Sequence, residues 1–560
     1  MATTSCRRRR RSSRFTSVAK PSGALHPRVQ KAQPEHFGIV AIDCAKARFK
    51  GMLADCYGRI LVPPTLAEQT RQGFREAIAA LRQAQASDEL RDLVIAIERT
   101  GAYHKPVQRA YVAAGYETRI VHPLASKQFR RIADPGNKTD DTDLLAIVRA
   151  TANGFGLLEP SRDPIYTQLQ LLARHRRDLV TKNAALRNQI HVELDALMPG
   201  LAATVGDIFD HEPALVIARH AGSAPAIQAL GLEGLARLLE ARGVRFQRRG
   251  LEKILAWTER APEAAECPLI HKRIMECLDD ERRARLGSIR ALERDLAASL
   301  VRTPYVLLLS FPGINVVSAA ELAGEMGPIA NYPHDGAITG RAGLFPSRSQ
   351  SDRVDHADGP LVRQANHALR YIILLIGENL LTCNAYFRGL AERWQAMGVD
   401  RRVQCVRAAK RFCRIAYQMV AGQQVFRHPG CRPRHKILEK LLKFYIEHET
   451  PMDQILRDLR SAIDAIPPAE HAMEAEPLRA ALGSPPSPAP TTADTDRRRT
   501  VRPPASSRRR SGPRPLREIL PAVWVRLGVK MVESNPKGET DSTGPHRPRS
   551  RTTPLDRVAV

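Results

Sequence analysis

The hydrophobic and polar positions between residues 37 and 160 follow two patterns, one typical of strands and one typical of helices. Apolar runs predict strands in "HFGIVAIDCAK" and "ARFKGMLAD", and a shorter third strand in "GRILVPP" that proline ends. Helical periodicity covers residues 66–85, and the apolar run 92–98 predicts another buried strand. A helix from about Pro106, a strand over 118–123 and a helix from Asp141 follow. Three strands and then alternating helices and strands predict an α/β domain with a mixed sheet.

The pattern is helical beyond residue 160. Residues 165–200 carry Leu, Ile and Val three and four positions apart, which predicts a long amphipathic helix or coiled coil ending at Pro199-Gly200. Residues 205–300 are also predicted to be helical throughout. In "LLLSFPGINVVSAAELAGEMG" (307–327), a Pro-Gly turn joins two apolar segments. It suits a helix–hairpin–helix lying against a DNA backbone, and equally a tight turn in a helical bundle.

These patterns define the expected domains. The strand order before residue 160 is the one expected of an RNase H-like domain. Pro-, Ser- and Arg-rich sequence after about Ile466 predicts disorder. The predicted division is a disordered basic tail (1–36), an RNase H-like domain (37–160), a helical or coiled-coil region (161–300), a mainly helical C-terminal domain (301–425), a helical extension (426–466) and a disordered tail (467–560).

Charge points to a polyanionic partner. The formal net charge of the 560 residues is +27. Residues 1–36 and the segment from Ala481 onward carry well over half of this excess, but the body between them is still clearly basic. A basic body suits a nucleic acid, whereas basic tails favour nonspecific binding of polyanions.

The cysteines and the apolar runs indicate the compartment. The nine cysteines form no CxxC pairs, which predicts reduced thiols and a cytoplasmic protein. "CPLIHKRIMEC" (267–277) lacks a fourth ligand and the spacing of a zinc site. The arginine-rich N-terminus precedes no apolar segment of a secretory signal, and "YIILLI" (371–376) is far too short to span a bilayer. We therefore expect a soluble protein.

Four acidic residues stand at matching places in the predicted fold. Asp43 and Glu98 end two strands that lie side by side in an RNase H-like sheet, and Asp140 and Asp143 share one face of the following helix. Four converging carboxylates would repel one another unless cations separate them. Oxygen ligands suit Mg²⁺, and two such ions about 3.5–4 Å apart would clamp a phosphodiester. The sequence therefore predicts a divalent metal site.

Each acid also has a structural interpretation. An aspartate that ends a strand is usually a turn former, and Asp140 could be the cap of its helix. For the isolated pair of Asp140 and Asp143 the structural interpretation is the more common one; the ordered set of four acids reverses that preference. Asp141, between the two, is expected to point elsewhere.

Several motifs together resemble one known family. "AIDCAK", "IERTGAYH", "VHP" and "KTDDTD" are followed by "FPGINVVSAAELAGEMG", "AGLFPSRSQSD" and "GPLVRQANHALRYIILLI". In this order, over roughly residues 37–425, they resemble the insertion-sequence 110 family of transposases. The resemblance implies a RuvC-like N-terminal domain with a DEDD carboxylate set, a coiled-coil segment and a C-terminal transposase domain with a catalytic serine. Carried over by position, the four acids are Asp43, Glu98, Asp140 and Asp143.

The resemblance also implies a serine nucleophile. The family's serine lies five residues after a proline, usually in a Ser-Gly pair, and five residues after Pro346 is Ser351. This chain departs from the pattern because Asp352 stands where glycine is common. Ser349 and Ser347 are the rivals if the register of the loop shifts. Attack by Ser351 on a phosphodiester would conserve bond energy in a phosphoserine linkage.

The expected partners follow from the same resemblance. They are DNA at the element ends and target, a structured guide RNA, Mg²⁺ or Mn²⁺, and further copies of the chain in a dimer or tetramer, with residues 165–200 as the dimer contact. The expected location is the bacterial cytoplasm, in association with the nucleoid. Candidate phosphate-binding residues are Lys127, Arg130, Arg131, Arg363 and Arg370.

Three functions remain open from the sequence. The first is a recombinase that mobilises an insertion sequence through the four acids and Ser351. The second is a hydrolytic RuvC-like nuclease in which water is the nucleophile. The third is a degenerate transposase that still binds nucleic acid, which the Ser351-Asp352 departure keeps possible.

Overall fold

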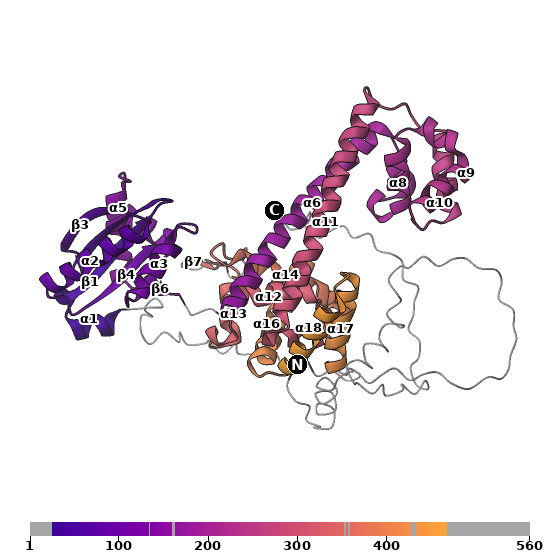
Figure 1. Cartoon of the computed structure of the whole chain (residues 1–560). Helices are drawn as coiled ribbons and strands as arrows, with labels where there is room; N and C mark the ends of the chain where they lie inside the picture. Colours follow the sequence, from indigo (N-terminus) through magenta and orange to yellow (C-terminus); the bar gives the residue numbers. More distant parts are fainter. Residues whose placement is uncertain are drawn as a thin grey trace, which may run out of the picture. The chain divides into compact units, whose positions relative to one another are not determined.

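The computed structural model describes residues 25–133, 135–159, 163–351, 354–356, 359–426 and 433–466. The chain divides after Ser161 into two compact units (Figure 1). Each unit is described by itself. Asp352 and both predicted disordered tails, except for residues 25–36, lie outside the described residues.

A six-stranded mixed sheet forms the centre of the first unit. Its order is β3-β2-β1-β4-β5-β6. Strand β1 pairs antiparallel with β2 and parallel with β4, β5 continues the parallel part, and β6 returns antiparallel at the edge. The predicted mixed-sheet α/β domain is therefore confirmed. The strands are β1 (Phe37–Cys44), β2 (Arg48–Asp55), β3 (Ile60–Glu68), β4 (Asp92–Glu98), β5 (Thr118–Val121) and β6 (Gly156–Leu158).

Helices cover both faces of this sheet. The central strands β1 and β4 are buried on both sides, which explains why they appear as continuous apolar runs. One face packs against α1, α4 and α5, and the other packs against α2 and α3. The helices are α1 (His26–Ala32), α2 (Arg71–Ser87), α3 (His104–Ala113), α4 (Pro123–Ala133) and α5 (Asp140–Ala152), with a 3-10 turn η1 (Pro34–His36).

Some predicted boundaries were wrong. Ordered structure begins before Phe37, because Arg28 of α1 pairs with Asp92 at 2.5 Å and with Glu117 at 2.7 Å. Strand β3 does not stop at its prolines but runs through both, which an edge strand with an irregular register tolerates. Helix α2 starts at residue 71 instead of 66, after the cap Thr70. Helix α4 and strand β6 were not predicted.

Two long helices dominate the second unit. Helix α6 (Pro164–Leu197) ends just before Pro199-Gly200 as predicted, and it packs along α11 (Pro268–Leu300). Its buried stripe, from Leu169 to Leu194, is thus covered by α11 and the neighbouring helices of the same chain. The buried stripe is therefore a contact within the chain, and the use of residues 165–200 as a dimer contact stays a prediction.

A small helical bundle joins the two long helices at one end (Figure 1). We call it the tip bundle. It has its own core, in which Trp257 donates a hydrogen bond to the carbonyl of Pro199 at 3.1 Å. Its elements are α7 (Leu201–Val205), η2 (Ile208–Asp210), α8 (Glu212–Ala221), α9 (Ala224–Ala241) and α10 (Arg248–Thr258), and they confirm the predicted helical region.

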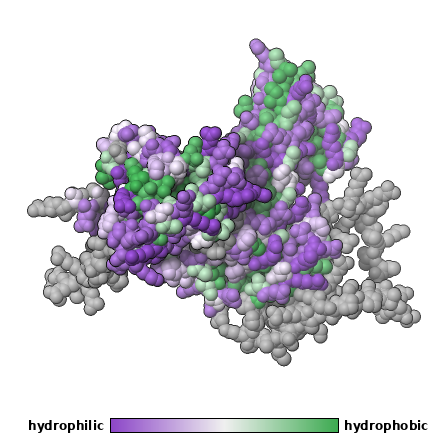
Figure 2. All heavy atoms as spheres, turned by 60° about the vertical axis from the view of Figure 1, so that its left-hand side comes forward, coloured by the Kyte–Doolittle hydropathy of each residue, from purple (hydrophilic) through white to green (hydrophobic). Residues whose placement is uncertain are grey.

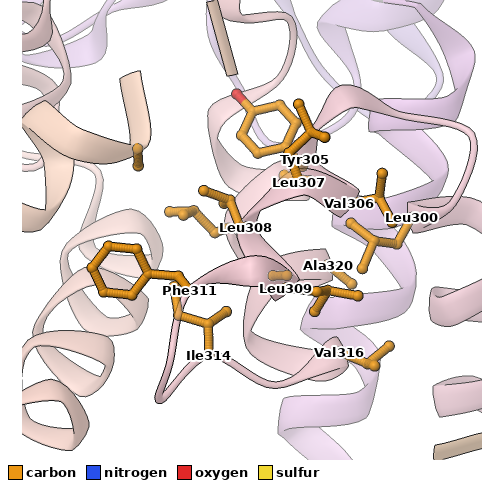
Figure 3. Packing of buried hydrophobic residues seen from close by; sticks show 14 of the residues in the cluster. Leu300, Tyr305, Val306, Leu307, Leu308, Leu309, Phe311, Ile314, Val316 and Ala320 are labelled. Atoms are coloured by element: carbon orange, nitrogen blue, oxygen red, sulfur yellow. The ribbon is translucent and has the colours of Figure 1, made fainter. Parts of the chain in front are cut away.

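The remaining helices form a second, larger core at the other end of α6 and α11 (Figure 3). Helices α17 and α18 pack into this core, so the predicted helical extension is part of the same body. The elements are η3 (Pro304–Ser310), α12 (Val316–Met326), η4 (Ile329–Asn331), α13 (Asp335–Arg341), β7 (Ser349–Ser351), β8 (Val354–His356), α14 (His367–Cys383), α15 (Ala385–Ala396), α16 (Arg401–Ala421), α17 (Pro433–Glu447) and α18 (Met452–Ala465).

The Pro-Gly turn at 312–313 lies between η3 and α12. Gly313 has φ +95°, a conformation that favours glycine. The ammonium of Lys440 donates to the carbonyls of Leu309, Phe311 and Ile314 at 2.7–2.9 Å. These bonds give the turn a structural role within the bundle, whereas its contact with DNA stays a prediction.

The surface seen in Figure 2 is mainly hydrophilic, with smaller hydrophobic areas between the hydrophilic ones. Within the described parts of the chain, no helix combines the length and the apolar character that crossing a bilayer requires.

Candidate functional site

Asp43 and Glu98 are neighbours at the carboxyl ends of two parallel strands. Strands β1 and β4 pair in register up to Ile42 and Ile97, and the next step along both strands reaches Asp43 and Glu98. Alternation along a strand puts these two side chains on the face of Ala41 and Ala96, where α5 packs. The sheet therefore brings together two acids that are 55 positions apart in the chain.

Helix α5 carries the other two acids, and threonines form its cap. Thr139 accepts a hydrogen bond from the backbone N–H of Thr142 at 3.2 Å, and the hydroxyl of Thr142 accepts one from the N–H of Thr139 at 2.9 Å. The interpretation of Asp140 as the helix cap is therefore wrong. The first turn still carries three aspartates, which the positive end of the helix dipole favours.

The three aspartates of α5 have different surroundings. Asp143 is half-buried, and its carboxylate lies 2.9 Å from Nη1 of Arg130. Asp140 is exposed. Asp141 pairs with Lys50 of β2 at 2.5 Å, and Lys50 is the cross-strand neighbour of Asp43.

Electrostatic interactions tie these acids into one group, which we call the acid site (Asp43, Glu98, Asp140 and Asp143). Burial raises the pKa of Asp43, and the negative charges of Asp143 and Asp140 raise it further. Burial also raises the pKa of Glu98, with added contributions from Asp43 and Asp143. Burial and neighbouring negative charge thus oppose the ionisation of Asp43 and Glu98.

The chemistry of the acid site suits a divalent cation. Its ligands are hard carboxylate oxygens, and a cation would relieve the repulsion that raises these pKa values. In the described residues, however, no three acidic, histidine or cysteine side chains are close enough to form a complete metal cluster. Arg130 provides the positive charge next to Asp143 instead.

Two residues of α4 contribute to the acid site in ways that the sequence did not predict. The hydroxyl of Ser126 donates to Glu98 at 2.9 Å, and Arg130 pairs with Asp143. Arg130 was predicted to hold phosphate, but its side chain is only 12% exposed and contacts an acid. Ser126 and Arg130 are four positions apart, so recognising α4 would have put both on one helical face. Lys127 and Arg131, the other two candidates on α4, are exposed.

The three candidate serines lie in the second unit, on or next to a two-stranded element of β7 and β8, which we call the serine hairpin. Ser349 and Ser351 are exposed in β7, and Ser351 pairs in register with Val354. Ser347 is half-buried, and its hydroxyl donates to the carbonyl of Pro360 at 3.0 Å. Arg348 holds Asp355 across the hairpin through two hydrogen bonds of 2.8 and 2.6 Å.

Arg370 anchors the base of this hairpin. Its guanidinium donates to the carbonyls of Ala342 at 2.8 Å and Gly343 at 3.3 Å, and also to that of Val362. Burial lowers the pKa of Arg370. The structure thus gives Arg370 a positioning role that its prediction as a phosphate ligand did not include, whereas Arg363 is exposed.

Comparison with known proteins agrees with this arrangement. A family model of the DEDD type, described as "Transposase", matches residues 40–199, and one described as "Transposase IS116/IS110/IS902 family" matches residues 305–392. A 43.6 kDa protein of insertion element IS110 from Streptomyces coelicolor is 26% identical over 308 residues, which cover 53% of this chain and 75% of the relative. A 44.8 kDa protein of insertion element IS116 from Streptomyces clavuligerus is 21% identical over 399 residues, or 69% of this chain and 95% of the relative.

Both models match in the order that the motifs predicted. The first covers most of the first unit and continues through α6 of the second, and the second lies within the second unit. The first covers Asp43, Glu98, Asp140 and Asp143, and the second covers the serine hairpin and Arg370. Transposases cut and rejoin DNA, so DNA is the substrate. The chain thus resembles the insertion-sequence 110 family of transposases in both of the segments that these models match.

Proposed function

We propose that this transposase exchanges DNA strands with two separate groups of residues, the acid site and Ser351. The first unit would act as an RNase H-like domain, a proposal supported by the sheet order and by the packing of α5 on β1. Asp43, Glu98, Asp140 and Asp143 would hold Mg²⁺ or Mn²⁺. Bound there, the metal would withdraw charge from the scissile phosphate.

Ser351 would be the nucleophile. Its oxygen would form a bond to phosphorus as the bond to one sugar oxygen breaks, so the serine loses a proton and the leaving sugar oxygen gains one. The product is a phosphoserine linkage that a second sugar hydroxyl can resolve without an external energy source. Exposure of Ser351 in β7 supports this choice over Ser347, whose hydroxyl already donates to Pro360.

The acid site and Ser351 belong to different units, so they would meet within one chain or between chains of a dimer or tetramer. The family resemblance favours a composite site made by partner chains. It also favours a structured guide RNA that brings donor and target DNA together. The basic body of the chain supports contact with such polyanions, and Lys127, Arg131 and Arg363 are exposed and positively charged.

This proposal rests on the position of Asp43 and Glu98. Each comes one residue after the last paired position of β1 and β4, and both face α5. The test compares Ser351→Ala, Asp43→Asn and the control Ser349→Ala in strand exchange on supercoiled DNA with Mg²⁺. We expect Ser351→Ala to abolish both exchange and the covalent protein–DNA adduct. Asp43→Asn should abolish both as well, and Ser349→Ala should retain them. Wild-type exchange by Ser351→Ala would refute the serine mechanism.

A hydrolytic nuclease is the second candidate, and one observation favours it. The acids occupy one compact unit by themselves, which suits a water nucleophile that needs no serine. In that case Ser351→Ala would leave DNA cleavage unchanged, and no adduct would form with the wild type. Asp43→Asn would still abolish cleavage.

A further inference from the structure

A polar pocket lies in the tip bundle, and none of the residues proposed for catalysis line it. Its volume is about 370 Å³, within the range of pockets that take small ligands. The end of α8, the end of α9 and the first half of α11 form its walls. Six of its lining residues are polar: Arg219, His220, Arg242, Lys272, Glu276 and Arg283. We call it the tip pocket.

The positive charge of the tip pocket is local. Residues 200–278 carry ten Lys or Arg residues and ten Asp or Glu residues, so the tip bundle as a whole is nearly neutral. Four of the residues that line the pocket are nevertheless Arg or Lys, and only Glu276 is acidic. A cluster of like charges on a neutral background is unfavourable unless an anion or a carboxylate compensates it.

Carboxylates next to the pocket compensate only part of this charge. Asp279 is fully buried and contacts Arg219 at 2.5 Å, Arg282 at 2.6 Å and Arg283 at 2.8 Å. Asp280 adds a second contact to Arg219 at 2.7 Å. With Arg242, Lys272 and Glu276 included, five cationic side chains meet three carboxylates. The group therefore keeps an excess of two positive charges.

The cations are also held in place before any ligand binds. The side chain of Lys272 packs against Gly222, the C-cap of α8 in the left-handed conformation. A Cβ atom at Gly222 would lie 2.6 Å from the Lys272 side chain. Its ammonium donates to the carbonyl of His220 at 3.0 Å. An ammonium carries three N–H donors, so this bond leaves it the capacity to bind a ligand oxygen. Arg242 lies 3.4 Å from the ring of His220. Fixed donors bind an anion with little loss of entropy.

We propose that the tip pocket binds a backbone phosphate of a nucleic-acid strand. Guanidinium and ammonium groups around one hollow are the donors that phosphate oxygens prefer. The long pair of α6 and α11 carries this pocket on a bundle with a core of its own (Figure 1). The transposase would thus hold its nucleic acid with residues other than those of the acid site. The proposal needs a nucleic-acid partner but neither Ser351 nor metal-dependent chemistry.

The test measures binding by the full chain in EDTA, so that no strand exchange takes place. Fluorescence anisotropy at several salt concentrations compares the wild type with Arg242→Gln/Lys272→Gln. The control is Arg245→Gln/Lys253→Gln, an exposed pair in the same bundle that removes the same charges outside the pocket. The probes are an RNA hairpin, a DNA duplex and inorganic phosphate. Thermal unfolding checks that both variants fold.

We expect the pocket variant to weaken binding of at least one strand about tenfold and to lower the salt slope by about one for each phosphate-binding cation that is replaced. The control should stay near the wild type. Amine-reactive labelling adds a local measurement, because the bound strand should protect Lys272 and leave Lys253 reactive. Equal losses of affinity in both variants would overturn the proposal. Protection of Lys272 by inorganic phosphate alone, without an effect on strands, would overturn it too.

Loss of the proposed catalytic function would give a different result. Asp43→Asn or Ser351→Ala should leave this binding unchanged even if either variant abolishes strand exchange. A failed phosphate proposal and a failed catalytic proposal are thus separate outcomes.

Discussion

The acid site and the serine hairpin differ in how the fold supports them. Buried strands and a packed helix hold the acids, and two of these acids have raised pKa values. The serine hairpin consists of two three-residue strands, and its β7 residues are exposed. Arg348 ties it across its strands, and Arg370 ties it to the helical core. The acid site thus combines rigid support with unfavourable charge, whereas the hairpin depends on a few polar contacts.

Neutralising one carboxylate of the acid site should have the largest effect on activity. It should lower activity, but it should maintain or raise stability. We expect Asp43→Asn and Glu98→Gln each to lower strand exchange by more than about a hundredfold. The pKa values of both acids are raised in the folded protein. Above the pKa values that Asp43 and Glu98 have in the unfolded chain, their ionised forms therefore oppose folding. Without metal, the variants should therefore unfold at the same or a higher temperature than the wild type at pH 7.

The sign of this effect depends on pH. As pH falls through the raised pKa values, the wild-type acids take up protons and the repulsion disappears. The advantage of the variants should then shrink toward zero near pH 4. Unfolding experiments in EDTA at several pH values measure this difference. Destabilisation by either variant at pH 7 would show that burial and repulsion do not dominate the contribution of these carboxylates to the free energy of unfolding.

Removing the anchor of the serine hairpin should have the next largest effect. Arg370→Ala removes the hydrogen bonds to the carbonyls at 342, 343 and 362, and hydrogen bonds of a charged donor are worth about 1.5–3 kcal/mol. We expect the free energy of unfolding to fall by about 2 kcal/mol and strand exchange to fall at least about tenfold. Limited proteolysis should cut residues 347–360 faster.

Two further variants separate positioning from charge. Arg370→Lys keeps the charge but loses the planar donor arrangement, so it should restore only part of the activity. Arg363→Ala removes an exposed charge seven positions earlier and should leave the proteolysis rate unchanged. Equal effects of Arg363→Ala and Arg370→Ala would contradict the anchoring role.

The same contrast explains what the sequence could predict. Strands β1 and β4 are buried on both faces, so their apolar runs identified the strands and put Asp43 and Glu98 at their ends. The serine hairpin has no such pattern, because its residues are polar and its strands short. Ser351 was therefore identified only through resemblance to a family. Patterns of burial predict the elements that carry a core, but not those that a few polar contacts support.

Errors at the element boundaries have a similar origin. The capping of α5 depends on Thr139 and Thr142, and the acidic run next to them obscured this signal. Helix α4 was missed because its Lys and Arg residues were interpreted only as candidates for phosphate binding and not as part of a helix. The stripe of α6 predicted a long helix correctly, but a stripe does not identify its partner. Here the partner, α11, lies about a hundred residues further along the same chain.

Arg130 tests how positive charge is balanced at the acid site. Its pairing with Asp143 neutralises part of the local charge and competes with a metal for the same carboxylate. Arg130→Gln should therefore tighten Mn²⁺ binding about fivefold, since it removes one positive charge at short range. Without metal, it should lower the free energy of unfolding by about 1 kcal/mol. Titration calorimetry of Mn²⁺ and unfolding in EDTA measure the two effects, with Arg131→Gln as an exposed control.

Disrupting a pair in the core of the second unit should give the smallest effect and leave both groups of proposed catalytic residues unchanged. His448 lies 2.7 Å from Glu293, and both side chains are 12% exposed. Although burial opposes the charge of His448, hydrogen bonds to Glu293 and to the carbonyl of Phe444 raise its pKa. Burial likewise opposes the charge of Glu293, but His448 and Arg176 lower its pKa.

The direction of the pH dependence follows from these two shifts. The contribution of His448 is complete below its unfolded pKa of about 6.5 and disappears as pH rises through the raised folded value. The contribution of Glu293 is complete above its unfolded pKa and disappears as pH falls through its lowered folded value. The pair should therefore stabilise the second unit at mildly acidic pH by about 1 kcal/mol, the net value of one hydrogen bond.

His448→Gln should flatten the loss of stability above pH 6.5, as measured by urea unfolding from pH 5.5 to 8.5. An unchanged slope in this variant would assign the pH dependence to other groups. Metal binding at the acid site should stay the same in either case, because it belongs to the other unit.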